Sequence, residues 1–377
     1  LNKLLIRILL HLQVEFSKNN IHNMSKYISD KIKILSFVCI ILVLYIHSGF
    51  SNEVLILNEK KTEMQTIYIL QFIISGMVGR IAVPLFYIIS GYLFFLNVPQ
   101  GMQSIYKKIY KRGRTLFIPY LIGCLFFVFF NVLIATIPWA SKYINSPIMP
   151  LFNNSITQII CSIFYDTGNG SPCAFQLWFL RDLILIVATS PLWYLCLKYA
   201  KWCFVIITFF LTYISMSYIP ITSLFWFVLG GQLTQVNLEH TYKKAGLICC
   251  LIFLIFSIVQ LLNPNYKIWE TARIPIICIG IIGIWNIYNV LIPVQYTLSE
   301  HKVMTTLCSF TFFIYLFHEP TLNIFRKIIV AILGKNEIGY IVSYLFSPWL
   351  FIISSMIIGF LLKKHYLAIY KVCTGGR

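Results

Sequence analysis

The sequence carries little charge for its length and has no long polar stretch. Charged residues make up 11% of the 377 residues and hydrophobic residues 59%, whereas a soluble domain has roughly 25% charged residues. This excludes a mainly soluble protein. Apolar runs of about 18 to 24 residues recur along the chain, and such runs are long enough for membrane helices. They are also too uniformly apolar for the strands of a membrane barrel, which alternate over about ten residues.

Acidic residues are especially scarce. The 12 Asp and Glu residues stand against 30 Lys and Arg, which gives a formal net charge of +18. A nucleic-acid partner is not expected, because the basic residues are spread over short connections, as the positive-inside rule requires of a protein in a lipid bilayer. Some of them could also hold an anionic cofactor or lipid headgroups at the inner face.

Metal-binding spacings are missing. The sequence has no CxxC motif and no His/Cys spacing of a metal site, so no metal is expected. Most of the 11 cysteines lie within apolar runs, where they behave as small apolar side chains. Cys161 and Cys173 share one connecting segment and could pair if that segment faces an oxidising compartment. The alternative is that both remain free.

The apolar runs predict an all-α polytopic membrane protein with about ten transmembrane helices. We expect these helices at 34–49, 81–96, 116–139, 177–197, 203–218, 223–233, 246–262, 274–291, 307–325 and 341–362. A separate helix at the outer interface is expected at 66–77. Basic residues around 107–114, 198–201, 243–244 and 363–364 place both termini in the cytoplasm. The difference in basic residues between the inner and outer connections is reduced by four lysines on the outer side, Lys60, Lys61, Lys267 and Lys335.

Three segments follow from this pattern. Residues 1–29 are an N-terminal extension, of which 1–23 could be untranslated because Met24 opens a natural start. Its apolar stretch is too short to span and lacks a cleavage site, so it is not interpreted as a signal peptide. Residues 30–365 form the membrane-embedded domain, and 366–377 form a cytoplasmic tail.

His47 stands in the first apolar run, KIKILSFVCIILVLYIHSG, where an apolar residue would be expected. In a helix that rises ~1.5 Å per residue it lies about 20 Å above Lys33, most of the way across a hydrocarbon core of ~30 Å. An ionisable side chain at that depth is costly and points to function. The alternative is a histidine satisfied by a neighbouring helix or by interfacial water.

Cationic side chains flank the next two runs. Arg80 stands at the outer mouth of GRIAVPLFYIISGYLFF, where a proline and a glycine could free carbonyls toward a cavity. It either lines a substrate pocket or anchors the interface. Lys111, Arg112 and Arg114 stand in KKIYKRGRTLFIPYL, at the inner side. Such a cluster suits the phosphates of a nucleotide-type carrier, and an ordinary topology signal is the alternative.

Charges also occur within two later runs. QLWFLRDLILIVATSPLWYL contains Trp178, Arg181 and Asp182. Adjacent residues of a helix point about 100° apart, so Arg181 and Asp182 are not expected to pair. A charge deep in lipid costs ~2.5–3.5 kcal/mol, so both together indicate a polar interior pocket. In the ninth run His318 and Glu319 precede a proline, and His318 is either catalytic or a structural hydrogen-bond donor.

Taken in order, these pieces resemble the integral-membrane acyltransferase 3 family, bacterial enzymes that O-acylate cell-surface glycans. The pieces are His47 in the first run, VPLFYIISGYLFF, RTLFIPYL, LWFLRDL followed by SPL, and SFTFFIYLFHEP. The resemblance covers about 30–365. The family usually carries an arginine eleven residues before the histidine, where this chain has Ser36, so that role would be omitted or taken by a group such as Lys33.

The resemblance implies an O-acyltransferase of the bacterial cytoplasmic membrane. The donor would be acetyl-CoA or another acyl-CoA, and the acceptor a hydroxyl of an envelope glycan or its lipid-linked precursor. His47 would be the general base or relay the acyl group itself, since an imidazole suits either role. The remaining assignments are His318 and Glu319 at the catalytic centre, Arg80, Trp178, Arg181 and Asp182 around the substrate, and Lys111, Arg112 and Arg114 at the carrier phosphates.

Two other functions compete with this interpretation. A glycan flippase or transporter would use the same intramembrane charges as a substrate path, but it predicts the internal repeats of many transporters, and the sequence shows none. A glycan polymerase would have a large outer loop, and the connection at 140–174 is modest and lacks a clear arginine pattern.

Overall fold

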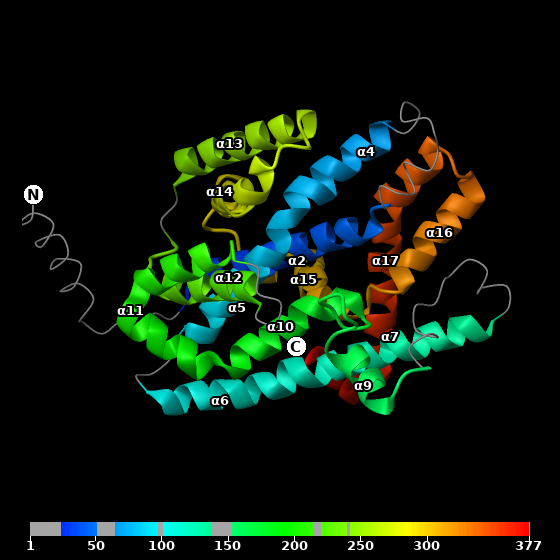
Figure 1. Ribbon diagram of the computed structural model, residues 1–377, viewed down its shortest axis with the longest axis horizontal. Coiled ribbons are helices and arrows are strands. Elements are labelled where there is room, and N and C mark those ends of the chain that lie inside the picture. The colour runs from blue at the N-terminus through cyan, green and yellow to red at the C-terminus, as the bar shows by residue number, and fades with distance from the viewer. Residues whose placement is uncertain are drawn as a thin grey trace, which may run out of the picture.

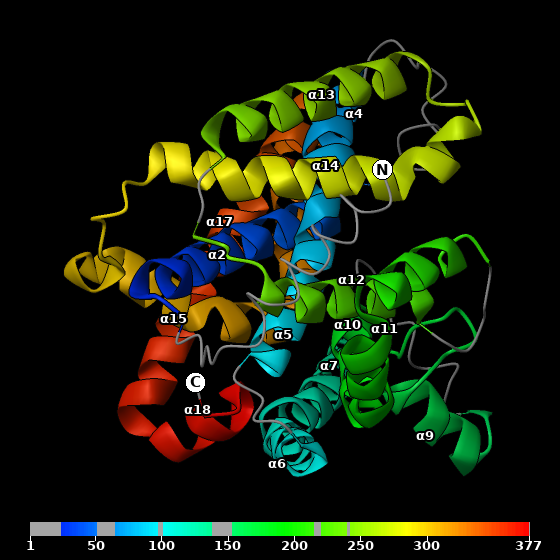
Figure 2. The ribbon, with the colours of Figure 1, turned by 90° about the vertical axis from the view of Figure 1, so that its left-hand side faces the viewer.

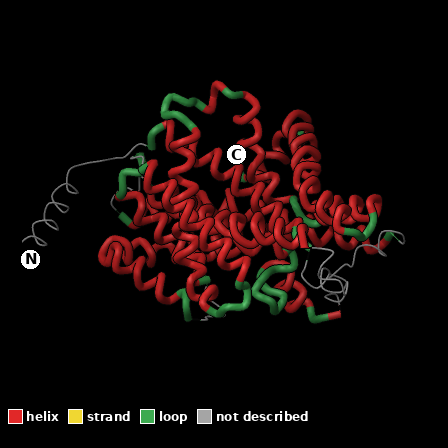
Figure 3. Tube along the Cα trace, turned by 90° about the horizontal axis from the view of Figure 1, so that it is seen from above, coloured by secondary structure: helices red, strands yellow, loops and turns green. Residues whose placement is uncertain are grey.

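The computed structural model describes residues 24–50, 65–96, 101–137, 153–214, 220–239 and 242–376. This part of the chain consists of helices and connecting loops, without a strand (Figure 3), which confirms the all-α prediction. The predicted extension at 1–23 lies outside the described residues. The cytoplasmic placement of both termini stays a prediction.

Seven helical stretches of the described chain are long and apolar enough to cross a membrane, fewer than the ten expected. They are α2 (Lys26–Ser48), Thr66–Phe95, Met102–Thr136, α11 (Ser190–Leu211), α13 (Lys243–Leu262), α14 (Ile268–Leu291) and α17 (Glu337–His365). Shorter helices are α9 (Ile156–Phe164), α10 (Trp178–Ala188), α12 (Ile221–Gln232), α15 (Lys302–Phe317), α16 (Thr321–Leu333) and α18 (Leu367–Thr374). The expected fourth, sixth and ninth spans are among these shorter helices.

The stretch Thr66–Phe95 changes its winding midway. The segments are α4 (Gln65–Gln71), the π-helical η1 (Phe72–Met77), the 3₁₀-helical η2 (Val78–Ile81) and α5 (Ala82–Phe95). The expected separate interface helix at 66–77 is therefore wrong, because it runs on into the span. Such π and 3₁₀ turns often mark functional or strained places in a helix.

The next stretch is also continuous. It consists of α6 (Met102–Arg112), the π-helical η3 (Gly113–Phe117) and α7 (Ile118–Thr136). Its 35 residues extend about 50 Å at ~1.5 Å per residue, well beyond the hydrocarbon core. The basic segment expected as an inner loop is therefore the second half of α6 and the start of η3.

Two breaks redistribute the predicted fourth and fifth spans. α10 ends at Ala188, and α11 begins at Ser190 with Pro191 in its first turn, where proline is favoured. Lys201 then interrupts α11 with φ 47° and ψ −125°. The predicted ninth span is also divided, because α15 ends at Phe317 and α16 begins only after Pro320.

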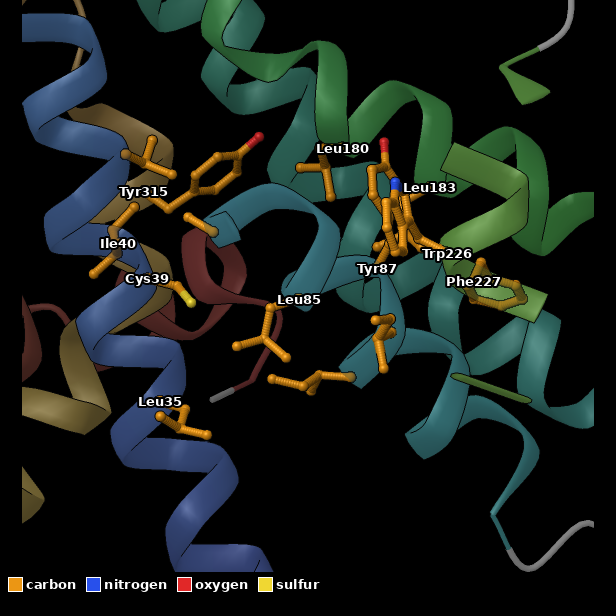
Figure 4. Packing of buried hydrophobic residues seen from close by; sticks show 14 of the residues in the cluster. Leu35, Cys39, Ile40, Leu85, Tyr87, Leu180, Leu183, Trp226, Phe227 and Tyr315 are labelled. Atoms are coloured by element: carbon orange, nitrogen blue, oxygen red, sulfur yellow. The ribbon is translucent and has the colours of Figure 1, made fainter. Parts of the chain in front are cut away.

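α2 and α5 lie in the middle of the bundle, between α13 and α14 on one side and α6 and α7 on the other (Figures 1 and 2). α5 and α12 approach each other at glycines. A Cβ at Gly91 would collide with the backbone carbonyl of Phe227, and one at Gly230 with the carbonyl of Ile88. Figure 4 shows part of this core, with Phe227 on the side of α12 and Tyr315 of α15 on the side of α2.

Candidate functional site

His47, the last residue but one of α2, meets His318 at the break between α15 and α16. Their ring centroids are 4.9 Å apart and the planes are inclined by 50°. Phe175 of the short 3₁₀ helix η5 (Phe175–Leu177) packs on the same His47 ring, with centroids 5.4 Å apart. His47 is half-buried, and His318 is completely buried. The break therefore brings together two imidazoles that are far apart in the sequence.

The hydrogen bonds of His318 determine which nitrogen can accept a proton. Its Nδ1 lies 2.6 Å from the carbonyl oxygen of Tyr315. Because a carbonyl only accepts, Nδ1 carries the hydrogen and donates it. In the neutral ring Nε2 then holds the lone pair, and this buried atom has no hydrogen-bond partner among the described residues. Since buried polar atoms are nearly always paired, Nε2 is a strong candidate for contact with a substrate or a moving proton.

Hydrogen bonds connect η5 to the same break. The Tyr315 hydroxyl donates to the carbonyl of Gln176 at 3.1 Å, and the Gln176 amide nitrogen donates to the carbonyl of Glu319 at 3.3 Å. Gln176 and Glu319 are both buried, and the side-chain oxygen of Gln176 has no partner within the described structure. Glu319 therefore lies next to His318 at the break, and its catalytic role stays a prediction. Gln176 and Tyr315 were missed because they look like ordinary neighbours of an apolar run.

Arg326 of α16 holds the end of α2. Its Nη1 donates to the carbonyl of His47 at 2.9 Å and its Nη2 to the carbonyl of Gly49 at 2.8 Å. The guanidinium also lies 4.5 Å from the centroid of the Phe50 ring. The last carbonyls of a helix lack partners and carry partial negative charge. Arg326 satisfies them, and in doing so it fixes the backbone that carries His47.

Arg181 and Asp182 pair with each other, so the expectation that they cannot is wrong. Arg181 reaches Oδ1 of Asp182 with Nη2 at 2.7 Å and with Nε at 3.0 Å. The long arginine side chain folds back along the first turn of α10, which a comparison of Cβ directions ignores. Nη1 of Arg181 donates to the carbonyl of Tyr165, and Nη2 also donates to the carbonyl of Gly170. The Ser223 hydroxyl donates to Oδ2 of Asp182.

These contacts make the Arg181–Asp182 pair a clamp between α10, α12 and the connection at 165–170. Trp178, the first residue of α10, is half-buried and packs on the apolar core. Arg80 faces a different cavity, bordered by α13 and α14. The described contacts therefore join His47 with His318, which Glu319 follows in the chain. Among the described residues, no hydrogen bond or ring contact connects Arg80, Trp178, Arg181 or Asp182 with either imidazole.

Lys111, Arg112 and Arg114 lie at the junction of α6 and η3. Lys111 and Arg114 are exposed and Arg112 is half-buried. Arg114 borders a cavity of about 220 Å³ together with Lys371 of α18. The segment predicted as a tail thus includes a packed helix whose Tyr370 is buried. Through Lys371, this helix adds a cation to the basic cluster of Lys111, Arg112 and Arg114.

The basic cluster is separated from His47 along α7. Phe127 of this helix packs on Phe175, the ring that touches His47. Phe127 is 13 residues beyond Arg114, and this corresponds to about 20 Å along a helix. The cationic end and the imidazole pair are therefore at different depths of the bundle.

Three smaller expectations can be compared with the structure. Lys33 is exposed and pairs with Asp30 at 3.0 Å, whereas Lys31 is the buried cation of this end and donates to Asn289 at 2.8 Å. Cys161 and Cys173 are both free thiols, so the possible disulfide is not formed. Among the described residues, no group of three or more His, Cys, Asp or Glu side chains could hold a metal ion.

Comparisons with known proteins identify a family for the chain. A family model of the acyltransferase 3 family, described as an acyltransferase domain, matches residues 30–363. The succinoglycan biosynthesis protein ExoH of Rhizobium meliloti (strain 1021) is 25% identical over 265 residues, which cover 66% of this chain and 67% of that protein. No solved structure matches the chain.

Proposed function

This chain belongs to the acyltransferase 3 family, and from that premise we propose that it moves an acyl group from a cytoplasmic acyl-CoA to a hydroxyl of a cell-surface glycan. We infer that the acyl group is acetyl. The acceptor is the glycan or its lipid-linked precursor. The enzyme resides in the bacterial cytoplasmic membrane. Family membership makes it an acyltransferase of groups other than aminoacyl groups, and the remaining specificity is our inference.

The observation that carries the proposal is the contact between the His47 and His318 rings, with the unpartnered Nε2 of His318. Acyl transfer to an alcohol needs a base that takes the hydroxyl proton as the oxygen attacks the thioester carbonyl. The carbon–sulfur bond then breaks, and the sulfur leaves as a thiol with a proton. Imidazole suits this exchange because it can accept and return a proton near neutral pH.

His47 is the residue that meets the substrate, because it is half-buried whereas His318 is enclosed. It takes the proton directly or first carries the acyl group on its ring. His318 holds the neighbouring lone pair, and Arg326 fixes the end of α2. Glu319 contributes a buried carboxyl group beside them.

Lys111, Arg112 and Arg114 would bind the phosphates of the donor, because guanidinium and ammonium groups are the usual phosphate ligands of proteins. Their separation of about 20 Å from the level of His47 supports a donor with a long arm between phosphate and thioester. Coenzyme A, with its pantetheine arm, has that form. Two features support coenzyme A as the donor: the positive charge of the cluster and its distance from His47 along the bundle.

The acceptor is inferred from the relative named for succinoglycan biosynthesis. That name concerns the biosynthesis of a glycan, and an acyltransferase with a comparable core would modify a related polymer. The test compares surface glycans from a deletion strain and from complemented strains by mass spectrometry. The deletion should remove the mass of one acyl substituent per modified sugar, and the intact gene should restore it. An unchanged glycan would overturn the proposal.

A further inference from the structure

A polar cavity opens between η2 and the hairpin of α13 and α14. Its volume is about 560 Å³, and Arg80, Lys267, Glu270 and Arg273 are among the residues around it. It thus collects three cations and one carboxylate. The cavity is distinct from the His47–His318 contact, because none of the residues around that contact borders it.

Arg80, Lys267 and Arg273 form no ion pair among the residues that the structure describes. Arg80 and Arg273 are exposed to the cavity, and their positive charges act on each other. Within the described residues, neither guanidinium forms an ion pair with a carboxylate. Like charges held together in a partly enclosed space favour an anionic ligand, which would relieve their repulsion.

The sidedness of the chain makes this concentration of charge unusual. Lys267 connects α13 with α14 on the predicted outer side, where the positive-inside rule disfavours basic residues. In the structure this exception is grouped with Arg80 and Arg273 around one cavity. A role in binding an anion explains why Lys267 stands on the predicted outer side, which the positive-inside rule does not explain.

The remaining side chains around the cavity can bind a sugar. Gln260 and Asn265 supply amide donors and acceptors, and Tyr266 and Trp269 supply aromatic surfaces with polar edges. Guanidinium groups add a fork that binds carboxylate or phosphate with paired hydrogen bonds.

One helix contact separates the cavity from the imidazole site. A Cβ at Gly79 would lie 2.9 Å from Cγ1 of Ile46, so η2 and α2 are in close contact there. Arg80 follows Gly79, and His47 follows Ile46. An extended acceptor at the predicted outer side could therefore place one group at each site.

We propose that the cavity around Arg80, Lys267 and Arg273 binds an anionic group of the acyl acceptor, a carboxylate or a phosphate. This inference rests on the proposed function only in taking the bound anion to belong to the acceptor. The carboxylate would come from an acidic sugar of the glycan, and the phosphate from the diphosphate of a lipid-linked precursor.

Binding to the purified full-length protein in detergent tests the inference without any acyl donor. Trigalacturonate and inorganic pyrophosphate are titrated as probes, with neutral maltotriose for comparison, and binding is followed calorimetrically. We expect saturable binding of at least one anion. Arg80→Gln and Arg273→Gln should each weaken it by about tenfold or more, since each removes a charged hydrogen-bond donor. Lys335→Gln, which removes an exposed cation of the predicted outer side away from the cavity, should bind as the wild type does.

The outcomes separate the two anion sources and the two proposals. Tighter binding of trigalacturonate assigns the cavity to an acidic sugar, and tighter binding of pyrophosphate assigns it to the carrier diphosphate. Binding of neither anion, or equal loss in Lys335→Gln and Arg273→Gln, overturns the inference. Anion binding by a protein whose deletion leaves the surface glycan unchanged would overturn the proposed function alone.

Discussion

At the scale of single residues, the site depends on which atoms of His47 and His318 are engaged. Nδ1 of His318 donates to a backbone carbonyl, and this leaves Nε2 directed away from that bond and unpartnered in the described structure. The buried ring is held by one hydrogen bond, so its orientation is set by the backbone of α15. The lone pair on Nε2 is then free to exchange a proton with the neighbouring ring of His47 or with its substrate.

Replacing His318 by Asn separates these two roles. Asn can place an amide N–H where Nδ1 stands and so keep the bond to Tyr315, but it has no counterpart of Nε2. We expect His318→Asn to lower the rate of acyl transfer by about 10²-fold or more, the usual contribution of a proton-transferring group. The measurement is the initial rate of acyl incorporation in membranes with matched protein levels.

The control for this variant is His301→Asn. His301 is an exposed histidine that precedes α15 and stacks on Tyr296. It should retain the wild-type rate. Equal losses in the two variants, or a His318→Asn enzyme at full rate, would remove His318 from the chemistry.

At this scale the sequence could single out residues but not all their partners. His47, His318 and Glu319 were identified because ionisable side chains are rare in apolar runs. The pairing of Arg181 with Asp182 was wrongly excluded, since the flexibility of arginine decides it rather than the helical angle. Nothing in the sequence connects Arg326 with His47. Only the fold shows that Arg326 donates to the carbonyl of His47.

At the scale of elements, helix breaks and glycine contacts place the site. The interruption at 318–320 divides the predicted ninth span into α15 and α16. It also brings the buried His318 ring into contact with His47 of α2. The packing of α5 on α12 keeps the other half of the bundle close, because Gly91 and Gly230 leave room for backbone against backbone.

Gly91→Ala should therefore destabilise the protein. The added Cβ would collide with the carbonyl of Phe227, and backbone cannot rotate away as a side chain can. We expect a loss of at least about 2 kcal/mol in the free energy of unfolding, as for other overpacked contacts. Thermal unfolding in detergent measures the change.

Gly113→Ala serves as the matched substitution, because nothing lies within 4 Å of the Cβ it would add and its φ of −52° is helical. It should be neutral or slightly stabilising, since alanine favours a helix over glycine. A Gly91→Ala protein as stable as Gly113→Ala would contradict the proposed packing of α5 on α12.

Hydropathy identified most of the apolar elements and missed how they are wound. A span at 81–96 was expected, but the π and 3₁₀ turns that join it to α4 leave no periodic signal distinct from an ordinary helix. The basic residues at 107–114 were taken for a loop because they are polar, although an amphipathic helix accommodates them equally well.

At the scale of the whole molecule, the proposed reaction requires the two ends of the bundle to face different compartments. The proposed donor cluster at Arg114 is predicted to face the cytoplasm, and His47 is predicted to lie toward the outer end. The connection between α9 and α10 should then be accessible from outside.

Cys161 reports this directly, because it is an exposed free thiol in α9, whereas Cys173 is buried. A membrane-impermeant maleimide added to intact spheroplasts should label the protein, and Cys161→Ser should remove that labelling. Labelling that appears only after the membrane is opened would show that the predicted orientation is inverted.

The central claim is that His47 carries the acyl transfer, and one measurement tests it most directly. Purified wild type and His47→Ala are reconstituted with radiolabelled acetyl-CoA and glycan extracted from the deletion strain, and label in the glycan is counted. The account predicts incorporation by the wild type and none above background by His47→Ala, with unchanged thermal unfolding of the variant. Incorporation by a folded His47→Ala protein at the wild-type rate would contradict it.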